Sequence, residues 1–353
     1  MPVKDLAQKR MSDLRRVLKD AQLGGYLTVN ALEMRYLCGV DLSEGEAVFL
    51  VTPSKAYCFT RTMIAPKMAP AASFMKIADV DGGMVDGALA FIQDKKIKTV
   101  GFAPAKVNFV LGQQLTQAGL VSAGGLVDEM RMVKYEDEIA RLKKSCQIAS
   151  DAFKKVKPLI KTGMTEHAVA CLIASQMIAG GADAIPFNIV CFGENTADAH
   201  HTPSKTRKLK NNEAVLMDFG CLYEGYSSDM TRSWWHGDNE PEEYRTVWAL
   251  VHQAYRAGAK SLRAGLACKD ADAAARRLIE AAGYGKQFFH SLGHGVGLET
   301  HDSPLLGPRS VAVLEAGMPV TVEPGIYFAG KWGVRWEDTF LVTADGSQKL
   351  TKN

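Results

Sequence analysis

Acidic side chains interrupt apolar, strand-like segments in the C-terminal part of this 353-residue chain. The segments VLMDFG, YSSDMTRSWW, TVEPGIYF and GVRWEDTFLV contain Asp218, Asp229, Glu323 and Glu337, and SLGHGVGLETHD contains His294. An ionised carboxylate is rarely buried in a protein unless it is paired or binds a metal. The set therefore indicates a metal site, and one suited to hydrolysis.

Two predicted turns bring the carboxylates together in pairs. Asp218 and Asp229 flank CLYEG, so a tight turn near Glu224 would place them opposite each other, or one diagonal step apart, in an antiparallel hairpin. Glu323 and Glu337 are symmetric about a short loop at residues 329–331, which would pair them in the same way. Each hairpin is thus predicted to present two acidic groups on one face.

Cations are expected among these groups, because four carboxylates in a small volume raise one another's pKa unless positive charge neutralises them. Two divalent ions would balance the charge. Oxygen-rich ligation with one imidazole fits Mn²⁺, Co²⁺ or Zn²⁺ better than a thiolate zinc site. Taken singly, each residue has an ordinary alternative: a turn aspartate, a solvated Glu323, a Glu337 paired with Arg335, or a loop histidine at His294. None of these alternatives explains the symmetric spacing about two turns.

Five longer segments carry a resemblance to a known family. GENTADAHHTP, MDFGCLYEGYSSDMTRS, HSLGHGVGLETHDSP, VTVEPGIYF and GVRWEDTFLVT, in this order and spacing, resemble the prolidase and aminopeptidase P family of pita-bread metallopeptidases. The segment ALEMRYLCGV resembles the first domain of that family. The resemblance implies an α+β fold, in which a small creatinase/prolidase-like α/β domain (residues 1–128) precedes a pita-bread catalytic domain (residues 129–353).

The resemblance also implies roles for individual residues. The ligands of two divalent ions would be Asp218, Asp229, His294, Glu323 and Glu337, with Asp229 and Glu337 bridging the two ions. Catalytic or substrate-binding roles would fall to Glu323, His200, His290, His301 and Arg335.

These implied roles agree with the chemistry of amide hydrolysis. Two ions can hold a bridging water, lower its pKa and polarise the substrate carbonyl. Glu323 would carry a proton from that water to the departing nitrogen. His301 is expected to stabilise the charge that develops on the carbonyl oxygen, and His200 to position the substrate. Arg335, on the strand face of Glu337, is expected to orient that carboxylate.

Several positions leave alternatives open. His200 and His201 are adjacent, so at most one is expected to face the site, and the resemblance favours His200. His290 is equally well explained as a substrate contact or as a core histidine bonded to the backbone. Ala199 and Asp302 replace a proline and a glutamate that are common in the family, which leaves the shape of the substrate pocket open. The glycines of GHGVG lack a P-loop Gly-Lys-Ser/Thr and are interpreted as room for the substrate.

The predicted function is hydrolysis of Xaa-Pro bonds in short proline-containing peptides by a dipeptidase or an aminopeptidase, with the short chain favouring dipeptides. The resemblance also implies a homodimer. Two alternatives are the same fold and metals acting on a small non-peptide compound, and a non-catalytic pita-bread binding protein. The complete set of five ligands disfavours the binding protein and any metal-free, creatine-splitting relative.

Composition sets the expected surroundings of the protein. A net charge of +3 is too small to favour nucleic acid or an anionic membrane as partner. Seven scattered cysteines without a CxxC motif favour a reducing cytoplasm. The N-terminal segment is a charged amphipathic helix without the apolar stretch of a signal peptide, and no apolar run of about 18 residues follows.

Periodicity predicts the main elements. In the first domain we expect a helix over residues 1–21, two strands within 46–60, a helix over 85–95 and a strand over 98–103. In the second we expect helices over 139–156 and 165–180, then over 241–264 and 269–282. These helices would pack outside a curved antiparallel sheet that bears the metal ligands.

Overall fold

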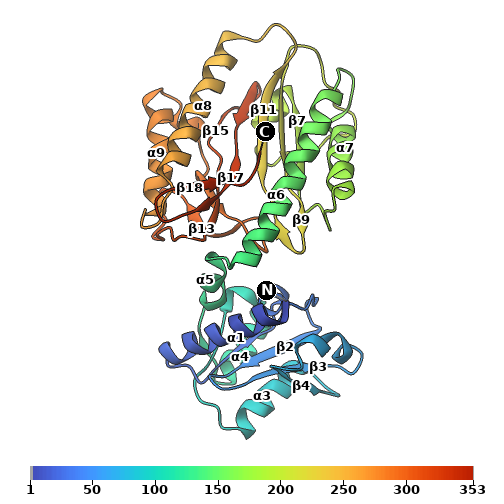
Figure 1. The fold of residues 1–353 in the computed structure, drawn as a ribbon, viewed down its shortest axis with the longest axis vertical. Helices are drawn as coiled ribbons and strands as arrows, with labels where there is room; N and C mark the ends of the chain where they lie inside the picture. Colours follow the sequence, from blue (N-terminus) through green and yellow to red (C-terminus); the bar gives the residue numbers. More distant parts are fainter. Residues whose placement is uncertain (1–2, 353) are drawn as a thin grey trace. The chain divides into compact units, whose positions relative to one another are not determined.

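The computed structural model describes residues 3–352 of the chain, which divides into two compact units, Met1–Arg131 and Met132–Asn353 (Figure 1). Met1 and Pro2, at the start of the predicted N-terminal helix, and Asn353 lie outside the described residues. Over residues 3–352, no helix combines the length and the apolar character needed to cross a bilayer. All seven cysteines are free thiols, and Cys171 is the exposed one.

The first unit contains a mixed six-stranded sheet in the order β4-β3-β2-β1-β5-β6. Its strands are β1 (Gly25–Thr28), β2 (Ala47–Val51), β3 (Ala56–Thr60), β4 (Lys76–Asp79), β5 (Val100–Phe102) and β6 (Val121–Ser122). Its helices are α1 (Val3–Asp20), α2 (Ala31–Cys38), α3 (Met84–Asp94), α4 (Phe109–Gln117) and α5 (Leu126–Met132). The expected first helix, strand pair, second helix and following strand all form. Helices α2, α4 and α5 were not predicted.

The second unit contains the four long helices that periodicity predicts: α6 (Glu136–Val156), α7 (Glu166–Ala179), α8 (Glu242–Ser261) and α9 (Cys268–Ala281). The apolar residues of α6 recur every three or four positions, and Leu142, Cys146 and Phe153 among them are buried. Helix α7 begins at a side-chain cap, because Thr165 Oγ1 accepts from the backbone N–H of Ala168 at 3.1 Å.

Antiparallel strands fill the space between these helices, and they form separate sheets where one curved sheet was expected. One sheet has the order β11-β8-β7, and another has the order β13-β12-β14-β17-β18. Their strands are β7 (Asn188–Phe192), β8 (Glu213–Phe219), β11 (Met230–His236), β12 (Gly293–Gly295), β13 (Asp302–Leu306), β14 (Pro319–Val322), β17 (Asp338–Val342) and β18 (Ser347–Lys349). Two ribbons extend them, β9 (Leu222–Tyr223) with β10 (Tyr226–Ser227), and β15 (Gly325–Phe328) with β16 (Trp332–Arg335).

Each large sheet has its own helix pair and its own apolar core. Phe153 of α6 and Val169 of α7 pack against Phe219 in the three-stranded sheet. In the same way, α8 and α9 pack against the five-stranded sheet through Val251, Ile279 and Val320, among others. Figure 1 shows the strands lying between these two helix pairs. The two cores cover the outer faces of the sheets, and the polar site lies where the sheets meet.

Candidate metal centre

The first acidic pair lies on the hairpin of β8 and β11. Glu224 and Gly225 adopt positive φ angles of 46° and 83°, which makes the tight turn that CLYEG predicts. Asp218 pairs with Thr231 across the ladder, so Asp229 lies one diagonal step from Asp218. The predicted hairpin is therefore confirmed, with the diagonal arrangement of its two aspartates.

The second acidic pair lies between two consecutive antiparallel ladders, β14–β17 and β15–β16. Val322 pairs with Asp338 in β14 and β17, and Gly325 pairs with Arg335 in β15 and β16. Both ladders share one register, which places Glu323 opposite Glu337. The predicted symmetry about the loop at residues 329–331 is confirmed.

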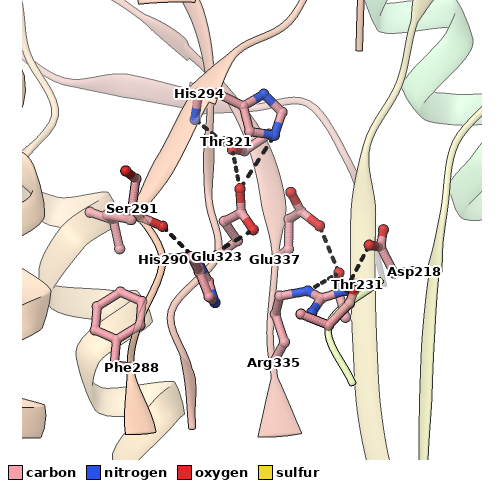
Figure 2. Close-up of polar contacts among 12 residues, drawn as sticks. Asp218, Thr231, Phe288, His290, Ser291, His294, Thr321, Glu323, Arg335 and Glu337 are labelled. Carbon is pink, nitrogen blue, oxygen red and sulfur yellow. Dashed lines mark hydrogen bonds and ion pairs between the residues drawn. The ribbon is translucent and has the colours of Figure 1, made fainter. Parts of the chain in front are cut away.

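His294 on β12 completes the group. Its Nδ1 lies 2.9 Å from the Gly295 carbonyl oxygen, so Nδ1–H can donate there and leave Nε2 free for a ligand. His294 Nε2 lies 3.3 Å from Glu323 Oε1 and 3.5 Å from Asp229 Oδ2. Possible ligand atoms of Asp229, His294 and Glu337 all lie within 4.8 Å of one another. Figure 2 shows Glu337 between the His294–Glu323 pair and the group formed by Thr231, Asp218 and Arg335.

All nine residues singled out in the sequence line one cavity of about 860 Å³. They are His200, Asp218, Asp229, His290, His294, His301, Glu323, Arg335 and Glu337. The volume lies within the range of about 300–1,000 Å³ that is usual for small-ligand pockets. Apolar side chains, including Phe187, Ile189, Phe289 and Leu305, line the same cavity.

The acidic groups fit divalent cations. Asp218 Oδ1 is buried and has no hydrogen-bond partner among the described residues, and such an oxygen is costly to leave unsatisfied. Burial raises the pKa of Asp229 and of Glu337 well above the ordinary range, and the charges of neighbouring carboxylates raise both further. A cation at this place would satisfy the free oxygen and offset the repulsion.

Glu323 differs from the other carboxylates of the site. Burial raises its pKa, but a protonated His294 outweighs burial through its hydrogen bond and its charge, and lowers the pKa of Glu323 to about 2. In that state Glu323 is ionised at neutral pH. Its Oε1 also receives the Thr321 hydroxyl at 3.3 Å, whereas Oε2 lies 4.0 Å from His290 Nδ1.

The histidines around the cavity occupy different positions. The His301 ring lies 4.2 Å from the His294 ring, and burial together with the His294 charge lowers the pKa of His301. His290 lines the cavity and also bonds inward, with Nδ1 2.8 Å from Ser291 O and Nε2 3.0 Å from the Tyr327 hydroxyl. Both interpretations of His290 therefore describe part of its surroundings.

His200 and His201 point to different places. His200 is exposed and lines the cavity. The Nε2 atom of His201 lies 2.7 Å from buried Glu166, away from the cavity lining.

Arg335 contacts a different carboxylate from the one expected. Its Nη2 donates to Asp218 Oδ2 at 2.7 Å, and its Nε donates to Thr231 Oγ1 at 3.0 Å. Glu337 instead accepts from the Thr231 hydroxyl at 2.7 Å. The expectation that Arg335 orients Glu337 directly is wrong, because Thr231 of the neighbouring strand lies between them.

Two further expectations from the sequence are clarified. Asp302 forms a buried ion pair with Lys134 at 3.3 Å and does not line the cavity, whereas Ala199 does. The glycines beside His294 have a role besides leaving room in the cavity, which Gly293 lines. A Cβ on Gly293 would overlap the Thr321 carbonyl oxygen, and a Cβ on Gly295 would overlap that of Ser303. These glycines therefore permit close approach of strands.

Sequence reasoning missed several side chains at the site. Thr231 lies two positions after Asp229, so strand alternation could have placed it on the same face. Tyr327 accepts from Arg335 Nη1 at 2.8 Å, and the register of the β15–β16 hairpin brings the two together, so the predicted loop at residues 329–331 could have indicated this contact. No local signal marks Arg276 or Arg309, which also line the cavity.

Comparisons with known proteins agree with this geometry. The metallopeptidase family M24 matches residues 140–344, and the creatinase/prolidase N-terminal domain matches residues 10–133. The chain is 31% identical over 346 residues to the uncharacterized peptidase YqhT of Bacillus subtilis (strain 168), with 97% of each chain covered.

Solved structures give the same result. The Xaa-Pro dipeptidase from Bacillus anthracis is similar with a TM-score of 0.91 and 32% identity, over 98% of each chain. The X-Pro aminopeptidase from Thermotoga maritima MSB8 is similar with a TM-score of 0.86 and 30% identity, over 97% of each chain. The predicted α+β class, with a creatinase-type first domain and a pita-bread second domain, is confirmed. The chain belongs to metallopeptidase family M24.

Proposed function

We propose that this metallopeptidase uses two divalent metal ions to cleave Xaa-Pro peptide bonds. The observation that carries the proposal is the convergence of five suitable donors on one cavity wall, with Asp218 Oδ1 buried and unsatisfied. The proposed ligands are Asp218, Asp229, His294, Glu323 and Glu337, with Asp229 and Glu337 shared by both ions. Mn²⁺, Co²⁺ and Zn²⁺ all suit such a donor set.

The protein's own residues supply the remaining steps. Bound divalent ions provide a water nucleophile at neutral pH and polarise the amide carbonyl. Oε2 is the freer oxygen of Glu323, so we assign to Oε2 the transfer of a proton to the departing proline nitrogen. The lowered pKa of His301 keeps its ring neutral, with one N–H to donate to the developing oxyanion. His200 is assigned to substrate positioning.

Arg335 is assigned a role in orienting other residues of the site. Its guanidinium is engaged with Asp218, Thr231 and Tyr327, and its side chain is 3% exposed. It therefore orients the site and is not free to bind the substrate.

The apolar lining supports a proline-containing substrate. Phe187, Ile189 and Leu305 offer surface that a pyrrolidine ring can cover, with release of water. The similar solved structures are named as an Xaa-Pro dipeptidase and an X-Pro aminopeptidase, and we transfer the shared Xaa-Pro specificity to this chain as a proposal.

A cationic side chain on the cavity wall favours dipeptides. Arg309 is exposed on the cavity lining and has no ion pair or hydrogen bond among the described residues. By contrast, Arg276 is held by Asp272 and by two backbone carbonyls. We therefore assign the carboxylate of an Xaa-Pro dipeptide to Arg309, because a longer peptide lacks a carboxylate at that place.

The test of the proposal is metal-dependent release of proline. Chelator-treated protein is reloaded with Mn²⁺, Co²⁺ or Zn²⁺ and assayed on Xaa-Pro dipeptides and on longer Xaa-Pro peptides. Hydrolysis that returns only with metal is expected. Protein that holds two ions and leaves both substrate classes intact would sink the proposal and favour a small non-peptide substrate.

Arg309→Met tests the dipeptide preference. It is expected to raise KM for dipeptides roughly twofold to fivefold, as for loss of one solvent-exposed charged contact, and to leave longer peptides unaffected. Arg277→Met is the matched control, because Arg277 is also exposed and does not line the cavity. Equal kinetics for both variants on dipeptides would contradict the assignment. The homodimer and the cytoplasmic setting stay predictions.

A further inference from the structure

The five proposed metal ligands come from two different sheets. Asp218 and Asp229 belong to the β8–β11 hairpin, and the other three lie on the five-stranded sheet or at the ends of its strands. Within residues 3–352, no ladder pairs a strand of one of these sheets with a strand of the other. The spacing between the two ligand groups therefore depends on the contacts of β11 with residues 335–339, which we call the seam.

Arg232 of β11 makes the most connected of these contacts. Its Nη1 donates to the carbonyl oxygens of Thr231 at 2.9 Å and of Glu337 at 2.6 Å, and its Nη2 donates to Asp338 Oδ1 at 2.7 Å. The Trp336 ring lies 4.5 Å from the guanidinium carbon. One guanidinium thus ties β11 to the backbone of Glu337 and to the side chain that follows it.

Asp338 is held from every side. Its Oδ1 also accepts from the Thr351 hydroxyl at 2.6 Å, and its Oδ2 accepts from the Tyr255 hydroxyl and from Lys349, both at 2.6 Å. These partners come from α8 and from the end of the chain. The carboxylate is therefore a fixed point against which Arg232 can locate β11.

Stability alone is a poor explanation for this ion pair. The Arg232 and Asp338 side chains are 1% and 0% exposed. A buried ion pair is often no more stabilising than apolar residues of similar volume, because the loss of hydration offsets the attraction. Strand alternation also turns both side chains away from the face of Thr231 and Glu337. The pair cannot touch the substrate, but it can set the alignment of strands that do.

We propose that the Arg232–Asp338 ion pair is a positioning element that sets the spacing between the two ligand groups and thereby controls binding of the second metal ion. The proposal rests on the two-metal site proposed above. An ion held mainly by the ligands of one sheet tolerates a shift at the seam. Two ions that share Asp229 and Glu337 do not, because each of them then has ligands from both sheets at once.

Arg232→Lys tests the proposal, because lysine keeps the charge and loses the planar fork that reaches two acceptors together. Arg245→Lys is the matched control, since Arg245 forms an exposed ion pair with Glu240. Chelator-treated proteins are titrated with Mn²⁺ by calorimetry, and EPR follows the signal of paired manganese. Melting temperatures and kinetics are measured on the same samples.

For R232K we expect the first ion to bind as in the wild type, and the second to bind about 10- to 100-fold more weakly. The paired-manganese signal should weaken in parallel, and kcat at limiting Mn²⁺ should fall while KM changes little. A lower melting temperature with unchanged binding of both ions would mean a merely structural role and would overturn the proposal.

If R232K does not fold, the same titration of Asp338→Asn decides by the same criterion. Wild-type protein that never binds a pair of ions would instead defeat the proposed function.

Discussion

The Thr231 hydroxyl joins charged groups of both sheets at the scale of a single residue. It donates to Glu337 Oε2 and accepts from Arg335 Nε, while Arg335 also holds Asp218. Thr231 is fully buried. Removing a hydroxyl from such a place leaves two charged partners short of a hydrogen bond, which costs more than the bond itself contributes.

Thr231→Val should therefore lower both stability and activity, although valine has nearly the same shape. We expect the free energy of unfolding to fall by about 1–3 kcal/mol and kcat by about 10- to 100-fold, through misplacement of Glu337 and Asp218. Urea unfolding and steady-state kinetics measure the two effects. Thr231→Ser keeps the hydroxyl and is the control, and a valine variant that matches the serine variant in kcat would refute this role.

Local sequence patterns predict the strand face on which a side chain lies better than they predict its hydrogen-bond partners. Strand alternation correctly places Arg335 on the face of Glu337, yet Arg335 bonds to Asp218 and Thr231. The choice of partner depends on which strand lies alongside, and β11 reaches β16 and β17 from more than 90 residues earlier in the chain. No local spacing carries that information.

At the scale of elements, tight turns are well predicted because their causes are local. The turn at Glu224 and Gly225 follows from residues within a few positions of each other, and the cap observed at Thr165 has an equally local cause. The shared register of Glu323 and Glu337 also follows from one short loop. Division of the strands into separate sheets was not predicted. It depends on the paths of the long connections between strands, which local sequence patterns do not determine.

The GHG segment shows what close strand packing requires. Gly295 pairs with Val320 on one side and with Asp302 on the other, so its strand lies between two neighbours. A side chain at Gly295 would overlap the Ser303 carbonyl oxygen. The backbone on both sides is held in ladders, so it cannot move away cheaply.

Gly295→Ala should thus destabilise the second unit by about 1–3 kcal/mol, the usual range for overpacking. Gly346→Ala is the control, because a Cβ there meets open space. Urea midpoints of the chelated proteins measure the difference, and calorimetry should also show weaker Mn²⁺ binding for G295A, since His294 adjoins the strained position. Equal midpoints for the two variants would show that the strands can separate at little cost.

At the scale of the whole molecule, every proposed metal ligand lies in the second unit, Met132–Asn353. The first unit has its own apolar core around Leu27, Leu50 and Phe102. An ion that binds the folded protein stabilises whatever must unfold to release it, by about 2.7 kcal/mol at a hundredfold excess over Kd. Hydrogen exchange should therefore slow in β8, β11, β12, β14 and β17 when metal is added, and change less in β1 to β5.

Removal of metal should reverse the effect of pH on stability. Burial and neighbouring carboxylates raise the pKa of Asp229 and Glu337 above the unfolded value of about 4. Between the unfolded and the raised folded pKa, the folded metal-free protein binds more protons than the unfolded chain, so its stability falls as pH rises. Chelated protein should therefore resist urea less at pH 8 than at pH 7, an interval that lies above the pH at which His252 and His301, whose pKa is lowered by burial, give the opposite trend. Loaded protein should not lose stability over this interval, because metal binding requires deprotonated ligands and strengthens with pH. A chelated protein that gains stability from pH 7 to pH 8 would show that these carboxylates do not repel one another in the folded state.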